Sequence, residues 1–135
     1  MAPKTYRELL VWQKAMDLAE HVYRTSESWP KTEIYGLTIQ IRRAAVSVPS
    51  NIAEGQGRRT PRQFTHFLSI AYGSLMEVET ALQLASRFGY SNQGTVQEGL
   101  RRSEEVGRLL NGLKRSLKAS IAADVRQVPP AKNGD

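Results

Sequence analysis

The sequence has no cysteine, only two histidines and few aromatic residues, which make up 7% of the chain. Without cysteine, disulfides, thiolate catalysis and zinc sites of the cysteine-rich kind are excluded. No apolar run approaches the roughly 18 residues that a membrane span requires. The N-terminus, MAPKTYRELL, lacks the apolar stretch of a secretory signal. These absences predict a cytoplasmic protein with no membrane segment.

Patterns that carry catalysis or metal binding are missing as well. Carboxylate-bridged metal bundles use Glu-x-x-His pairs, but Leu18 stands three residues before His21, and Gln63 stands three residues before His66. The chain has no G-x-S-x-G motif, and its Gly-Gln-Gly run lacks the strand and the Lys-Ser/Thr pair of a phosphate loop. We therefore expect no enzymatic activity, no metal and no cofactor.

The residues that are present favour one all-α domain. The chain of 135 residues is long enough to bury a core, and 40% of it is hydrophobic. Apolar residues recur every three or four positions in four stretches, which predicts helices over about 6–27, 31–56, 61–88 and 93–122. The short loops predict an up-down-up-down antiparallel four-helix bundle over 1–125. Residues 126–135 have paired prolines and no apolar period, which predicts a disordered tail.

The second of these helices contains a proline, Pro49. Proline inside a helix removes a backbone hydrogen bond and costs about 3 kcal/mol, so the helix must either bend or stop there. The apolar spacing keeps its phase from Ile41 to Ile52. This favours a continuous helix that is bent at the proline and ended by Gly55 and Gly57.

Other helix positions carry weaker signals. Thr5 with Glu8, and Thr60 with Gln63, have the spacing of capping boxes at the starts of the first and third helices. Gly73 lies in the middle of the third helix, where glycine is a poor helix former. Glycine is tolerable at this position if a neighbouring backbone approaches it closely.

Positive charge is in excess, with a net charge of +6 and an isoelectric point near 9.9. Such an excess attracts polyanions, although it also fits a solvated surface that keeps the protein soluble. If the excess does bind polyanions, nine residues are candidates for contacting nucleic acid. They lie on the second, third and fourth helices and in the loop between the second and third: Arg42, Arg58, Arg59, Arg62, Arg101, Arg102, Lys114, Arg115 and Lys118. The free N–H groups at the start of the third helix are expected to add to the attraction for anions.

A row of polar residues is predicted on the second helix. Ser47, Asn51 and Glu54 are spaced i, i+4 and i+7 and therefore share one face. Arg43 on the same face and Glu77 on the third helix complete the set. We interpret these five residues as a buried hydrogen-bonded network that fixes the register of the helices. The alternative is a polar pocket or a contact with a partner.

The first helix has an apolar stripe that is wider than one neighbouring helix requires. Trp12 and Tyr23 belong to this stripe. They are candidates for an interface between copies of the chain.

Three segments of the chain resemble a known family: YRELLVWQKAMDLAEHVY at 6–23, YGLTIQIRRAAVSVPSNIAEGQGR at 35–58 and FLSIAYGSLMEVETAL at 67–82. The resemblance is to the four-helix-bundle family of 23S rRNA-intervening-sequence proteins and covers residues from about Tyr6 to Ile121. It implies a homopentamer whose activity is largely uncharacterised. More distantly, the chain is similar to the accessory variability proteins of retroelements, which are basic pentameric bundles that bind nucleic acid and a reverse transcriptase.

Two functional hypotheses follow. The first is a non-enzymatic, oligomeric accessory module that binds RNA or DNA without sequence preference. The second is a homo-oligomeric scaffold that binds a protein partner and has no nucleic-acid role. The sequence alone does not choose between them.

Overall fold

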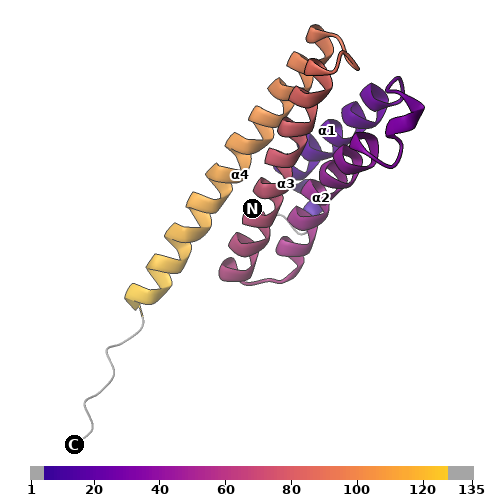
Figure 1. Ribbon diagram of the computed structural model, residues 1–135. Helices are drawn as coiled ribbons and strands as arrows, with labels where there is room; N and C mark the ends of the chain where they lie inside the picture. Colours follow the sequence, from indigo (N-terminus) through magenta and orange to yellow (C-terminus); the bar gives the residue numbers. More distant parts are fainter. Residues whose placement is uncertain (1–4, 128–135) are drawn as a thin grey trace, which may run out of the picture.

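The protein is an all-helical bundle of four α-helices. The computed structural model describes residues 5–127, and this part of the chain contains no strand (Figure 1). Its elements are two 3-10 helices, η1 (Tyr6–Glu8) and η2 (Lys31–Glu33), and four α-helices, α1 (Leu10–Ser26), α2 (Leu37–Gly57), α3 (Pro61–Arg87) and α4 (Gln93–Gln127). The predicted all-α four-helix bundle is confirmed.

Each helix packs against two neighbours. Helix α1 contacts α2 and α4, and α3 contacts the same two, whereas the diagonal pairs α1–α3 and α2–α4 make no close contact among the described residues. Successive helices therefore lie side by side and run in opposite directions, as expected for helices joined by short loops.

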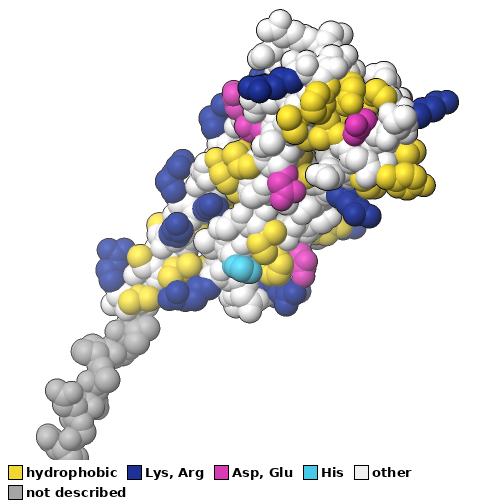
Figure 2. All heavy atoms as spheres, viewed as in Figure 1, with side chains coloured by type: hydrophobic (Ala, Val, Ile, Leu, Met, Phe, Trp, Pro, Cys, Tyr) yellow, Lys and Arg dark blue, Asp and Glu magenta, His cyan; other side chains and the backbone are white. Residues whose placement is uncertain are grey.

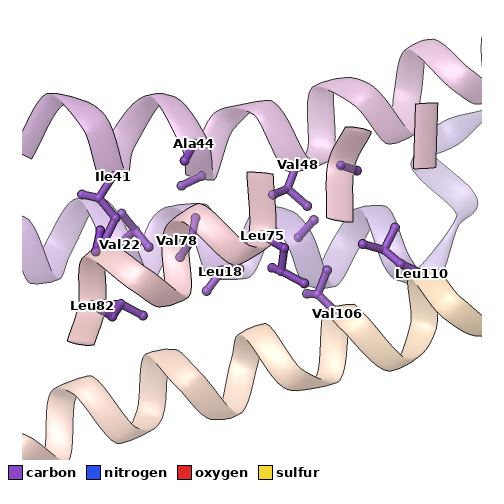
Figure 3. Close-up of a cluster of buried hydrophobic side chains, with 14 of the residues drawn as sticks. Leu18, Val22, Ile41, Ala44, Val48, Leu75, Val78, Leu82, Val106 and Leu110 are labelled. Atoms are coloured by element: carbon purple, nitrogen blue, oxygen red, sulfur yellow. The ribbon is translucent and has the colours of Figure 1, made fainter. Parts of the chain in front are cut away.

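The apolar stripes of all four helices meet in one core (Figure 3). Its largest fully buried side chains include Leu18 of α1, Ile41 of α2, Leu75 and Leu82 of α3, and Leu110 of α4. Full burial of one such side chain contributes about 1.5–3 kcal/mol. The recurrence of apolar residues at every third or fourth position therefore accounts for most of the fold.

Helix α2 continues through Pro49, which is buried inside it. Of the two glycines predicted to end the helix, Gly57 is its last residue, whereas Gly55 lies inside it and is buried against α3. A Cβ atom at Gly55 would lie 2.8 Å from the Cβ atom of Phe67. The helix ends at Gly57, and the first residue with a left-handed conformation is Arg59, with φ of 66°. The turn therefore places an arginine where a glycine is the usual choice.

Predicted boundaries differ from the structure at the starts of the first and second helices and at the end of the fourth. The first helix is predicted to run unbroken from about residue 6 with a cap from Thr5. Instead, Leu9 is extended, with ψ of 123°, and separates η1 from α1, and the Thr5 side chain makes no cap hydrogen bond. The prediction begins the second helix at about 31, but only η2 and a turn precede α2, which begins at Leu37.

The prediction ends the fourth helix at about 122, but α4 continues to Gln127, so Arg126 and Gln127 do not belong to the predicted tail. The rest of that tail, 128–135, lies outside the described residues. The predicted Thr60 cap of α3 is confirmed, since its Oγ1 accepts a hydrogen bond from the backbone N–H of Gln63 at 3.3 Å.

The helices differ in length, and this difference positions the candidate site. Helix α1 has 17 residues and α4 has 35. Lys14 of α1 lies 3.5 Å from Glu105, so α1 covers only the first part of α4. The last turns of α4 lie against the start of α3, and in Figure 1 they form an arm beyond the rest of the bundle. Within residues 5–127, no helix combines the length and the apolar character needed to cross a membrane.

Candidate nucleic-acid interface

Part of the predicted polar network exists, on the seam between α2 and α3. The hydroxyl groups of Ser47 and Ser74 are joined by a hydrogen bond of 2.8 Å. The Asn51 side-chain amide donates to the Ser47 carbonyl at 2.8 Å and to the Ser47 hydroxyl at 2.9 Å. Ser74 is buried, whereas Ser47 and Asn51 are half-buried at the rim of the seam. These contacts link α2 to α3 and hold one register between them.

The other three members of the network are exposed in this chain, so their predicted burial is wrong. Glu54 extends to the surface and pairs with Arg58 at 2.8 Å, one turn further along α2. Arg43 and Glu77 are exposed and have no ion-pair partner among residues 5–127. The physical reason is their position at the outer edge of the helix contact, where long charged side chains reach water more easily than they reach the core.

Four of the nine predicted nucleic-acid-binding residues form hydrogen bonds or ion pairs within the chain. Arg42 is the clearest case. Its Nε donates to the Ser26 hydroxyl at 2.8 Å, its guanidinium donates to the Tyr23 carbonyl at 3.2 Å, and the group lies 4.7 Å from the centre of the Tyr23 ring. Arg42 therefore satisfies carbonyl and hydroxyl groups at the C-terminus of α1. Arg58 is the second, through its pair with Glu54.

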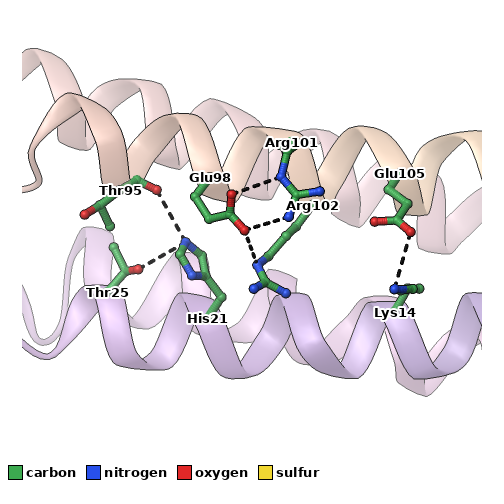
Figure 4. Close-up of polar contacts among 8 residues, drawn as sticks. All are labelled: Lys14, His21, Thr25, Thr95, Glu98, Arg101, Arg102 and Glu105. Carbon is green, nitrogen blue, oxygen red and sulfur yellow. Dashed lines mark hydrogen bonds and ion pairs between the residues drawn. The ribbon is translucent and has the colours of Figure 1, made fainter.

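Arg101 and Arg102 share one carboxylate, that of Glu98 (Figure 4). Arg101 donates two hydrogen bonds to it, at 2.7 and 2.9 Å, and Arg102 Nε forms an ion pair with it at 3.0 Å. The hydrogen bonds from Arg101, together with the positive charges of Arg102 and His21, lower the pKa of Glu98 to about 2. These two arginines thus share one carboxylate, which offsets one of their two positive charges.

The same region joins α1 to α4 through polar contacts. His21 Nε2 lies 3.4 Å from both the Thr95 carbonyl and the Thr25 hydroxyl (Figure 4). The ion pair of Lys14 with Glu105 lies further along this seam. Among residues 5–127, no three His, Asp or Glu side chains are close enough together to hold a metal ion.

The remaining five predicted cations have no ion-pair partner within residues 5–127: Arg59, Arg62, Lys114, Arg115 and Lys118. Lys114 is half-buried, with its Nζ 5.4 Å from the centre of the Tyr72 ring. Arg126, which had been assigned to the tail, joins them as an exposed residue of α4. We refer to these six residues as the basic end.

The basic end arises because α3 begins where α4 finishes. Pro61 of α3 lines the same hollow as Ile121 of α4, so the turn after α2 lies beside the last turns of α4. Figure 2 shows lysine and arginine side chains along this arm of the molecule. Cations that are separated by up to 67 positions in the sequence are therefore gathered in one region without acidic partners.

The start of α3 itself offers less to an anion than its position predicts. Pro61 has no N–H group, and the N–H of Gln63 already donates to Thr60 Oγ1. The N–H of Phe64 donates to the Thr60 carbonyl at 2.9 Å. Any attraction at this end therefore comes mainly from side-chain charge.

Two apolar hollows flank α2. The one between α1 and α2 has a volume of about 390 Å³, and its lining includes Trp12, Met16 and Val46. Trp12 is half-buried there, and the centres of the Trp12 and Tyr6 rings are 5.1 Å apart. Tyr23, the other predicted interface residue, is 42% exposed. The second hollow, between α2 and α3, has a volume of about 300 Å³.

The fold and the charge distribution together define a class: a basic four-helix-bundle protein with one long helix that carries unpaired cations. The sequence pattern of the family described as "23S rRNA-intervening sequence protein" matches residues 7–112, which is most of the chain. The chain belongs to the family of 23S rRNA-intervening sequence proteins.

A crystal structure has the same fold. It is that of a protein of unknown function from the S23 ribosomal protein family of Bacteroides thetaiotaomicron, with a TM-score of 0.70 and 23% sequence identity. The likeness covers 78% of this chain and 98% of that one. No curated protein matches the sequence significantly. At this identity, the neighbour supports the fold and carries no residue-level function.

Proposed function

We propose that the protein is a non-enzymatic, oligomeric accessory module of the cytoplasm that binds nucleic acid without sequence preference. The observation that carries this proposal is the basic end, where six cations have no ion-pair partner within the described chain. Contacts of lysine and arginine with phosphates supply most of sequence-independent nucleic-acid affinity. Cations that are already paired contribute less, because binding must first separate them from their carboxylates.

A pair of matched variants tests this proposal. One variant replaces Lys114, Arg115 and Lys118 with alanine. The control replaces Lys31, Arg43 and Arg87, three exposed cations without ion-pair partners that lie outside the basic end. Both variants lose the same net charge, so a long-range field alone predicts equal loss of binding. Local contact with phosphates predicts a much larger loss for the first variant.

The measurement is fluorescence anisotropy of a labelled 20-base-pair duplex from about 50 to 200 mM salt, where electrostatic affinity changes steeply. Loss of three phosphate contacts is expected to reduce the slope of log K against log salt by about 2–3. Circular dichroism checks that both variants are folded. Absence of binding by the unmodified protein at about 50 mM salt, or equal losses in the two variants, contradicts the proposal.

Oligomerisation, which we expect to be pentameric, is proposed on separate grounds. Met16 and Val46 are 44% and 43% exposed beside the apolar hollow between α1 and α2. Replacing both with glutamate is expected to lower the mass measured by light scattering. Glutamate at Ile70, which is 40% exposed on α3, is the control for a simple loss of exposed apolar surface.

The alternative function is a homo-oligomeric scaffold for a protein partner. The apolar hollow between α2 and α3 favours it, since apolar surface flanked by polar residues is typical of protein contacts. The salt titration separates the two functions. A scaffold without a nucleic-acid role shows no binding to the duplex, while the effect of the Met16 and Val46 changes on its mass remains.

A further inference from the structure

A third hollow lies within the basic end, between the start of α3 and the last turns of α4. Its volume is about 520 Å³, which is in the range of small-molecule sites. Its lining comes from two short stretches: Thr60, Pro61, Arg62 and Gln63 at the start of α3, and Ile121, Asp124 and Val125 on α4. The wall is mostly apolar, with a few polar groups at its edge, which is the usual composition of a ligand site.

Two opposite charges line this hollow without neutralising each other. No ion pair joins Arg62 to Asp124, and neither residue has an ion-pair or hydrogen-bond partner for its side chain within residues 5–127. A guanidinium binds anionic oxygens, and a carboxylate accepts N–H groups. The pair can therefore hold a ligand that carries an anion at one end and N–H donors at the other, with an apolar part between them.

We propose that the hollow takes one nucleotide unit of a single strand. The base lies against Pro61, Ile121 and Val125, one phosphate binds Arg62, and an N–H group of the base donates to Asp124. This inference rests on the proposed nucleic-acid role and specifies it further. A base inside a duplex is stacked and paired and cannot enter the hollow, whereas a base of a single strand can turn out of the stack.

The surroundings favour a strand over a free nucleotide. Arg59, Lys118 and Arg126 continue the positive charge beyond the hollow, so phosphates on either side of the bound unit meet further cations. Each of the four bases has at least one N–H group on its Watson–Crick edge, so none is excluded. Guanine has two adjacent ones, at N1 and N2, and is expected to bind most tightly.

Substitution of Asp124 by asparagine distinguishes this binding mode from simple electrostatic attraction. D124N removes a negative charge, so attraction to phosphates alone predicts tighter binding to every nucleic acid. In the proposed mode, D124N also removes the charged acceptor of the base. Binding of a 12-nucleotide single strand is then expected to weaken about five- to tenfold, while binding of the corresponding duplex stays the same or becomes tighter.

The apolar wall is tested in the same assay. Val125 is 58% exposed, so V125N is expected to leave the fold intact while weakening single-strand binding about threefold. I70N is the matched control, because Ile70 is a β-branched residue of α3 that is 40% exposed and does not line the hollow. A second readout uses a single strand that carries one 2-aminopurine base. The fluorescence of this base should rise on binding, because the base leaves its stack, and the D124N variant should produce a smaller rise.

The outcomes separate this inference from the proposed function. If the unmodified protein binds strand and duplex alike and D124N tightens both, the hollow takes no base, yet the nucleic-acid role stands. If the unmodified protein binds neither, the proposed function itself fails. Titration with GMP and AMP forms the last arm: binding of GMP as tight as that of the 12-nucleotide strand identifies a mononucleotide site and overturns the assignment to a strand.

Discussion

The turn between α2 and α3 contains a residue whose replacement should stabilise the protein. Arg59 has φ of 66°, in the left-handed region where a side chain with Cβ is unfavourable by about 1–2 kcal/mol. Glycine adopts this conformation without that penalty, although it loses more backbone entropy on folding. Comparison of R59G with R59A isolates the backbone effect, since both variants lose the same charge. We expect R59G to be the more stable by about 1 kcal/mol.

The assay is thermal and urea unfolding of both variants, followed by circular dichroism. A difference of about 1 kcal/mol corresponds to a difference in Tm of about 3–5 °C for a domain of this size. Both variants should lose nucleic-acid affinity equally, because Arg59 belongs to the basic end. If R59A equals or exceeds R59G in stability, the left-handed turn does not exist in solution and the reasoning is refuted.

Three further predictions concern stability. Gly73→Ala should stabilise the fold by about 0.5–1 kcal/mol, because Gly73 is exposed and a Cβ atom there meets no neighbouring element within 4 Å. Gly55→Ala should destabilise the fold, because its Cβ atom would lie 2.8 Å from the Cβ atom of Phe67. Urea unfolding measures the free energy of unfolding of both variants. The pKa of Glu98, about 2, lies below its ordinary 4.5, so its ion pairs stabilise the protein above about pH 4.5, and this contribution disappears as the pH falls toward 2. Unfolding at pH 6 and pH 2.5 should therefore differ less in E98Q than in the unmodified protein. A double-mutant cycle with Ser47→Ala and Ser74→Ala should give a coupling energy of about 0.5–1.5 kcal/mol, and additive effects would contradict the hydrogen bond.

The architecture could be predicted from the sequence because helix packing depends on apolar periodicity, which is a local pattern. The apolar spacing, which keeps its phase from Ile41 to Ile52, correctly indicated that α2 passes through Pro49. No neighbouring element approaches Gly73 closely. The close approaches to glycine occur instead at Gly55 and Gly99, where a Cβ would lie 2.8 Å from a side-chain atom of α3. Periodicity indicates which face a residue occupies, but not how near the neighbouring helix comes.

The candidate site was only partly predictable. The spacing of Glu98 before Arg101 and Arg102, and of Glu54 before Arg58, is that of helical ion pairs and would have shown that these arginines are paired within the chain. The hollow had no signal in the sequence. It exists because α4 continues to Gln127, which brings Val125 opposite the start of α3, and the register of two helices cannot be read from either one.

The unequal lengths of the helices also determine which part of the bundle unfolds locally first. Helix α1 spans about 26 Å and α4 about 52 Å, so the final turns of α4 have one neighbour instead of two. Amide protons near residue 120 should therefore exchange with solvent much faster than those near Val106, which is fully buried. The segment that carries most of the unpaired charge is thus also the segment that can change shape at least cost to the core.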